Sequence, residues 1–153
     1  MKLYYSPGAC STAPHIVACE AGVPLELEKV DLGSKRTASG EDYLAVNPKG
    51  YVPALRLDDG SVLTEVSAII QYLADRAPAS GLAPPAGTME HYRMLEWIGY
   101  IATEIHKGFG PLWNARLAPE ARAAALAALA RRLDLVEQVL GRQAFLMGKD
   151  FTM

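Results

Sequence analysis

The sequence predicts an α/β domain followed by an all-helical domain. Short strand-favouring segments alternate with helical patterns up to residue 76. Beyond residue 87, apolar residues recur at the spacing of long helices. Residues 77–87 are rich in Pro, Gly and Ala, which is typical of a linker. The predicted boundaries are therefore 1–76 for the α/β domain, 77–87 for the linker and 88–153 for the start of the helical domain.

The first strand and the first helix flank a cysteine. Residues 2–5 favour a strand, residues 6–8 form a turn signal, and helical spacing follows from Ala13, with Ser11 or Thr12 as the N-cap. Cys10 is thereby expected at the positive end of a helix, where unpaired backbone N–H groups and the helix dipole favour a thiolate. The alternative, that Cys10 is a small buried hydrophobic residue, remains equally open at this point.

The rest of the first half predicts three more strands and two helices. Residues 25–30 alternate as a strand with one wet face, parallel to the first strand because a helix connects them. Residues 31–41 are predicted as a loop and residues 42–46 as a short helix. Pro53 stands at the entrance of a strand and is a candidate for a cis Val52-Pro53 bond. A hairpin turn at 58–60, a strand at 61–63 and a helix from Thr64-Glu65 complete this half; the last two strands are predicted to pair antiparallel.

The second half predicts two long helices. Thr88 is a candidate N-cap for one continuous helix over 89–107, and Pro119 begins a second helix that ends at Gly141. Their expected core stripes contain Met94, Ile98, Ile101 and Ile105 in the first helix, and Leu126, Leu129, Leu133, Val136 and Leu140 in the second. Two helices bury little surface, and Phe151-Thr152 is typical of a helix start, so we expect this sequence to be incomplete.

Composition excludes some classes of function. The 153 residues carry a net charge of −2 and no basic cluster, which argues against a nucleic-acid surface. No segment approaches the ~20 apolar residues of a membrane span, and no signal peptide is evident, so a cytoplasmic protein is expected. Cys10 and Cys19 are ~13 Å apart along a helix, too far to pair with each other. Residue 13 is alanine, so any redox chemistry at Cys10 is expected to be monothiol.

Several motifs together resemble bacterial glutathione S-transferases of the beta class. They are Tyr5-Ser-Pro-Gly-Ala-Cys-Ser11, Val46-Asn-Pro-Lys-Gly-Tyr-Val-Pro-Ala-Leu55, Leu63-Thr-Glu65, Ile70-Gln-Tyr-Leu-Ala-Asp75 and Glu104-Ile-His-Lys-Gly-Phe109. The resemblance runs over the whole chain, in order and at matching spacing. It implies a thioredoxin-like N-terminal domain, an all-helical C-terminal domain and a homodimer.

The resemblance also implies a site for glutathione. Cys10 would lie next to the glutathione sulfur, the Val52 backbone beside cis Pro53 would pair with its cysteinyl part, and Lys35 would face its glycine carboxylate. Glu65 and the backbone of residue 66 would receive the γ-glutamyl end. The implied catalytic residues are Cys10, His106, Ser11 and Tyr5, and the implied glutathione-binding residues are Cys10, Lys35, Tyr51, Val52, Pro53, Glu65, Val66, Gly99, Thr103, Glu104, Ile105, His106 and Lys107.

Two positions depart from the family's pattern. Residue 66 is valine where the family usually has serine or glycine, and residue 99 is glycine where asparagine is common. Each change removes a side-chain hydrogen bond, which predicts glutathione binding weaker by about 0.5–1.5 kcal/mol.

The predicted function is a glutathione transferase that conjugates the glutathione thiolate to a small, hydrophobic electrophile, with glutathione as co-substrate and no metal. One alternative is a monothiol glutathione-dependent disulfide reductase or peroxidase on the same fold; another is a non-catalytic binding or regulatory protein. The electrophile pocket is expected around Tyr100, Ile105, Phe109 and Trp113, although aromatic residues at helical spacing are more often core.

Overall fold

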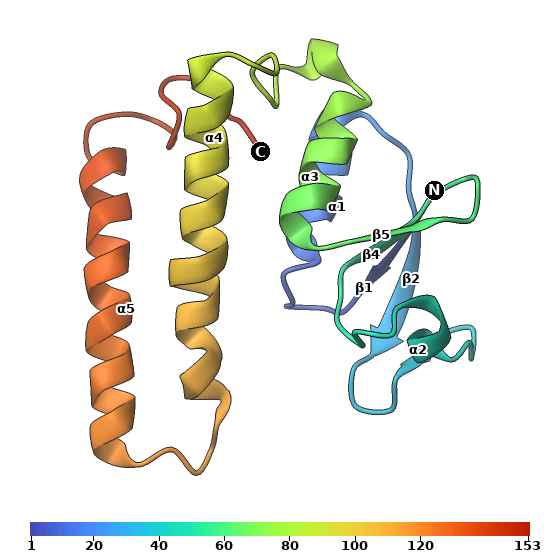
Figure 1. Cartoon of the computed structure of the whole chain (residues 1–153), viewed down its shortest axis with the longest axis horizontal. Coiled ribbons are helices and arrows are strands. Elements are labelled where there is room, and N and C mark those ends of the chain that lie inside the picture. The colour runs from blue at the N-terminus through green and yellow to red at the C-terminus, as the bar shows by residue number, and fades with distance from the viewer. The chain divides into compact units, whose positions relative to one another are not determined.

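The strand-favouring segments of the first half form one mixed sheet in the computed structural model, which describes residues 1–153 (Figure 1). The strand order is β3-β2-β1-β4-β5, with β1 parallel to β2 and antiparallel to β4. The bounds are β1 Lys2–Tyr5, β2 Glu26–Asp31, β3 Arg36–Thr37, β4 Ala54–Arg56 and β5 Val62–Thr64. The predicted parallel pair and the β4–β5 hairpin are both confirmed.

Helices α1 (Thr12–Ala21) and α3 (Val66–Asp75) pack against each other. Their ribbons lie side by side in Figure 1. Val17 of α1 and Ile69 and Leu73 of α3 are buried. Gly22 ends α1 in the left-handed conformation at φ 66°, as its place after the last helical residue predicts.

A second group of buried residues involves α2 (Tyr43–Val46) and the strands. Tyr4, Val30, Tyr43, Val46, Val52 and Ala54 form this hydrophobic cluster. Leu3 and Tyr4 are both fully buried, and adjacent strand residues point to opposite faces, so both faces of β1 are covered. The chain from α2 to β4 is thus held against the centre of the sheet.

Three details of the first half differ from the sequence predictions. The predicted loop 31–41 contains β3, which pairs antiparallel with β2 through Val30 and Thr37. The second strand and the last strand are each shifted by one residue, to Glu26–Asp31 and Val62–Thr64. Ser11 stands at the N-cap position of α1, yet its hydroxyl makes no capping hydrogen bond. A two-residue strand and a one-residue shift are too small for periodicity to resolve.

The predicted continuous helix over 89–107 is wrong in its second half. Thr88 caps α4 (Met89–Tyr100) by accepting a hydrogen bond from His91 N–H at 3.2 Å, as predicted. A π-helical turn, η2 (Ile101–His106), follows, and then the 3₁₀ segment η3 (Lys107–Trp113). Of the predicted stripe, Met94 is buried, Ile98 and Ile105 are half-buried and Ile101 is exposed.

The predicted core stripe of α5 (Pro119–Leu140) is also partly wrong. Leu129 is buried, but Leu126, Leu133 and Leu140 are exposed in this structure. The side of α5 that packs against η2 and η3 carries Ala125, Ala128 and Arg132 around Leu129. The spacing of leucines along the helix does not predict such a face. None of the helices combines the length and the apolar composition that crossing a bilayer requires.

The chain divides into two units, each described here by itself. The first is Met1–Ala83 together with Met153, whose N–H donates to the Leu82 carbonyl at 2.9 Å. It includes a 3₁₀ turn, η1 (Pro78–Ser80), inside the predicted linker. The second unit is Pro84–Thr152.

Candidate functional site

Cys10 lies in the turn between β1 and α1, two residues before the helix begins. The turn is closed by Thr12 N–H, which donates to Ala9 O at 3.1 Å, and Ala13 N–H, which donates to Cys10 O at 3.2 Å. The half-buried Cys10 thiol donates to the carbonyl of Val52 at 3.4 Å. The Val52-Pro53 peptide bond is cis. A thiol at the start of a helix is therefore held against the backbone that leads into β4.

The hydroxyl of Ser11 holds this turn together from within. It donates to Ser6 O at 3.2 Å and accepts from Ser6 N–H at 3.2 Å. Ser11 is buried, and both ends of the turn are therefore fixed by one side chain. Tyr5, the last residue of β1, pairs in register with Lys29. The predicted catalytic roles of Ser11 and Tyr5 stay predictions.

Glu65 stands at the start of α3 with its backbone in the left-handed region, at φ 72° and ψ 129°. Such a conformation in a residue other than glycine costs on the order of 1 kcal/mol and is frequent at binding sites. The Glu65 carboxylate accepts from Lys49 Nζ at 2.7 Å, and Lys49 also donates to Thr64 Oγ1 at 2.9 Å. Val66 follows as the first helical residue, where backbone N–H groups lack helical partners.

Lys35, Tyr51 and Glu65 belong to the same unit as Cys10. The Lys35 ammonium donates to Gly50 O at 2.9 Å, so it lies against the turn that precedes Tyr51. The Tyr51 side chain is 73% exposed, whereas its carbonyl accepts two hydrogen bonds. The first unit therefore brings Lys35 to the segment 50–53, and the contribution of Tyr51 to the fold comes from its backbone.

The other predicted residues lie in the helical unit. Thr103 Oγ1 donates to Gly99 O at 3.0 Å within the helix, and Glu104 pairs with Arg132 of α5 at 2.8 Å. A cavity of about 300 Å³ lies between η2, η3 and α5, lined by Thr103, Glu104, Lys107, Gly108, Pro111, Ala125, Ala128, Leu129 and Arg132. Ile105, His106 and Gly99 do not line this cavity, and His106 and Gly99 are exposed.

The residues expected around an electrophile pocket do not gather in that cavity either. Tyr100 packs toward α5, because its hydroxyl donates to Arg132 O at 3.0 Å. Phe109 is exposed, and so is Trp113. Within the helical unit, Tyr100 thus helps to join α4 to α5.

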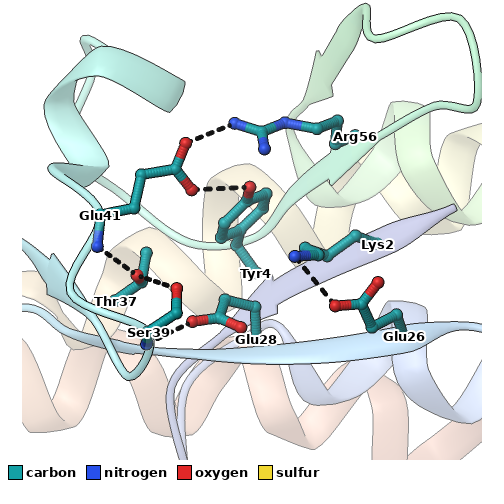
Figure 2. A network of polar contacts seen from close by, with 8 residues as sticks. All are labelled: Lys2, Tyr4, Glu26, Glu28, Thr37, Ser39, Glu41 and Arg56. Atoms are coloured by element: carbon teal, nitrogen blue, oxygen red, sulfur yellow. Dashed lines mark hydrogen bonds and ion pairs between the residues drawn. The ribbon is translucent and has the colours of Figure 1, made fainter.

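Sequence reasoning missed a polar network on the sheet (Figure 2). The Tyr4 hydroxyl donates to Glu41 Oε2 at 3.2 Å, and Arg56 donates to Glu41 Oε1 at 2.9 Å. The Arg56 guanidinium also lies over the Tyr4 ring, 5.2 Å from its centroid. Burial raises the pKa of Tyr4 to about 12, so its hydroxyl is a proton donor at neutral pH. Side chains alternate between the two faces along β1 and β4, which places Tyr4 and Arg56 on the same face of the sheet. This alternation is the sequence signal that could have indicated the network.

A second part of this network holds the segment between β3 and α2 on the sheet (Figure 2). Ser39 N–H donates to Glu28 Oε1 at 2.9 Å, and this hydrogen bond lowers the pKa of Glu28. Glu41 N–H donates to Thr37 Oγ1 at 3.0 Å, and Lys2 pairs with Glu26 at 2.9 Å. The Ser39 and Glu41 contacts hold the residues between β3 and α2, whereas the Lys2–Glu26 pair joins β1 to β2. Nowhere in the structure do three His, Cys, Asp or Glu side chains gather as a metal site would require.

A mixed sheet with a cysteine at the start of its first helix and a cis-proline directly before β4 defines a thioredoxin-like domain, here followed by a helical unit. Residues 8–76 match the family described as glutathione S-transferase, N-terminal domain. Glutathione S-transferase GstA of Escherichia coli O157:H7 is 48% identical over 153 residues, which are 100% of this chain and 76% of that protein.

Solved structures agree with this match. A sphingomonad glutathione S-transferase complexed with glutathione superposes with a TM-score of 0.94 at 46% identity, over 99% of this chain and 76% of that chain. The bacterial beta-class enzyme of Sphingomonas chungbukensis superposes with a TM-score of 0.93 at 43% identity, with the same coverage. The chain belongs to the glutathione S-transferase family, and it resembles the bacterial beta class that its motifs indicate.

Proposed function

We propose that this protein is a glutathione transferase that binds glutathione along residues 51–53, with the glutathione sulfur beside Cys10. The observation that carries the proposal is the contact of the Cys10 thiol with the Val52 carbonyl, 3.4 Å apart, at the start of α1. It places a thiol next to backbone groups that an extended peptide can pair with. The relative with 46% identity that was solved with glutathione supports the choice of ligand.

The charged ends of glutathione have candidate partners in the first unit, which we propose as the glutathione-binding domain. Glu65 and the N–H groups at the start of α3, including that of Val66, would receive the ammonium and the carboxylate of the γ-glutamyl end. Lys35 would face the glycine carboxylate. The Lys49 ammonium that now contacts Glu65 would have to share this carboxylate with the ligand.

The conjugation reaction would use the glutathione thiolate as nucleophile toward a small, hydrophobic electrophile. The positive end of the α1 dipole would favour the thiolate. The proposed contributions of Gly99, Thr103, Glu104, Ile105, His106 and Lys107 belong to the helical unit and stay predictions. A homodimer and a cytoplasmic location are likewise proposals that rest on the family.

Cys10→Ala tests which reaction needs the cysteine thiol. Conjugation needs only the glutathione thiolate, so Cys10→Ala is expected to keep most of its activity toward chlorodinitrobenzene. Thiol–disulfide exchange needs Cys10 as the attacking thiolate, so the variant is expected to lose reduction of a glutathionylated peptide. Both rates are measured for wild type, Cys10→Ala and Cys19→Ser.

Cys19 serves as the control because it is an exposed cysteine in α1, away from the start of the helix. Loss of both reactions in Cys10→Ala would contradict the assignment of conjugation to the glutathione thiolate. A wild-type protein that neither conjugates nor binds glutathione at millimolar concentration would favour a non-catalytic binding role.

A further inference from the structure

We infer that Tyr43 and Asn47 are positioning residues for the site: together they hold the Tyr51–Val52 peptide in the orientation that glutathione and Cys10 require. The inference rests on the proposed function for its ligand, but its geometric basis lies entirely in the first unit. Neither residue belongs to the set that the sequence motifs point to as contacting glutathione.

Two side chains donate to one carbonyl. The Tyr43 hydroxyl donates to Tyr51 O at 2.6 Å, and Asn47 Nδ2 donates to the same oxygen at 2.8 Å. Tyr43 is fully buried and Asn47 is 2% exposed. Burial raises the pKa of Tyr43, so the hydroxyl stays protonated and able to donate at neutral pH. Both lone pairs of the Tyr51 carbonyl are therefore engaged by buried donors.

Asn47 also shapes the turn between α2 and Tyr51. Its N–H donates to Tyr43 O at 2.8 Å, and its carbonyl accepts from Gly50 N–H at 2.9 Å. Its Oδ1 accepts from Lys49 N–H at 3.1 Å. The backbone and the side-chain amide of Asn47 thus hold the turn together. The same side-chain amide donates to the Tyr51 carbonyl.

The consequence for the site follows from peptide geometry. The C=O and the N–H of one trans peptide point in opposite directions, so fixing the Tyr51 carbonyl also fixes the Val52 N–H, on the side away from Tyr43 and Asn47. The next carbonyl, that of Val52, accepts from the Cys10 thiol. Rotating the Tyr51–Val52 peptide would leave two buried donors unpaired, which is strongly unfavourable in a buried site.

The two donors are themselves mounted on a fixed element. Asp42 caps α2 by accepting from Leu44 N–H at 3.1 Å, and Tyr43 N–H donates to Lys35 O at 2.9 Å. The Tyr43 ring packs on the Tyr4 ring, with 5.6 Å between centroids. The position of α2 on the sheet therefore determines where Tyr43 and Asn47 hold the Tyr51 carbonyl, and with it the backbone beside Cys10.

Tyr43→Phe and Tyr4→Phe form a matched pair for the test. Each substitution removes one phenolic hydroxyl from the same buried cluster and keeps the ring. Tyr43 loses its bond to Tyr51 O, whereas Tyr4 loses its bond to Glu41, which is not connected to residues 51–53. Both variants are made in the full chain with Cys19→Ser, so that Cys10 is the only thiol. Asn47→Asp, which keeps the acceptor for Lys49 N–H and loses the donor to Tyr51, is the second test variant.

Calorimetric titration with glutathione and the rate of Cys10 alkylation by iodoacetamide are the two measurements. We expect Tyr43→Phe and Asn47→Asp to raise the Kd for glutathione about three- to tenfold, the equivalent of one hydrogen bond. We also expect faster alkylation, because a thiol that no longer donates to a fixed carbonyl ionises more readily. Tyr4→Phe is expected to lower the Tm while changing the Kd and the alkylation rate less than twofold.

The inference would be overturned if the Kd and the alkylation rate changed equally in Tyr43→Phe and Tyr4→Phe, or changed in neither variant. Tyr43 would then have a purely structural role. A folded Asn47→Asp variant with wild-type values would overturn it as well. Should wild type fail to bind glutathione, the proposed function fails, and the alkylation rates alone then decide whether the pair positions Val52 and Cys10.

Discussion

Glu65 is the residue that we propose as the acceptor for the glutathione ammonium. Its backbone is held in the left-handed region at the start of α3, and its carboxylate contacts an ammonium, that of Lys49, at 2.7 Å. Both side chains are more than half exposed, so this ion pair adds little to folding stability. The contact instead demonstrates that the Glu65 carboxylate accepts an ammonium group in its folded position.

Glu65→Gln is therefore expected to weaken glutathione binding about tenfold or more, because a charge-assisted hydrogen bond to the γ-glutamyl ammonium is lost. The free energy of unfolding should change by less than about 1 kcal/mol. Isothermal titration and urea unfolding measure the two effects.

Glu26→Gln is the matched control for Glu65→Gln. Glu26 is equally exposed, at 65% against 66% for Glu65, and it also pairs with a lysine, Lys2, at 2.9 Å. An equal loss of affinity in both variants would show that general surface charge, and not Glu65, attracts glutathione.

At the scale of elements, the network around Glu41 joins strands to the segment that carries α2. Glu41 lies between β3 and α2, Tyr4 lies in β1 and Arg56 lies in β4. Because Tyr4 is buried, its phenol resists ionisation, and its pKa is raised to about 12 from an ordinary value of 10.0. The unfolded chain loses the Tyr4 proton at lower pH than the folded chain does.

The stability of the first unit is accordingly expected to fall as pH rises from about 10 toward 12, since only the unfolded state releases the Tyr4 proton in that interval. Urea unfolding, followed by circular dichroism across this range, measures the slope. In Tyr4→Phe the fall should be shallower than in wild type. An identical pH slope in both proteins would mean that Tyr4 does not control alkaline unfolding.

Most elements were predictable because their signals are local. The turn before Cys10, the N-cap Thr88 and Pro119 at the start of α5 each specify a boundary within a few residues. The π-helical turn at Ile101–His106 was not predictable, because the same residues also fit a regular helix and only packing distinguishes the two. The exposed leucines of α5 were assigned to a core for the same reason: spacing gives a face but not its partner.

The candidate site was predictable to a different extent in each part. Motifs pointed to Cys10, Val52 and Glu65, whose surroundings in the first unit the structure now describes. Asn47 lies inside one of the quoted motifs, but neither the motif nor the sequence around Tyr43 indicates that both side chains donate to the Tyr51 carbonyl. The predicted residues of the helical unit are chemically suitable, but spacing along a helix does not define what they contact.

For the molecule as a whole, the central claim is that the first unit presents Cys10 to glutathione. The most direct measurement is the intact mass of the protein after exposure to oxidised glutathione, with peptide mapping and a reductant control. The Cys10 thiolate would attack the disulfide, form a mixed disulfide and release one glutathione thiolate. We predict one reductant-reversible glutathionyl adduct on Cys10 and none on Cys19, although Cys19 is the more exposed cysteine. An adduct on Cys19 alone, or no adduct at all, would contradict the account.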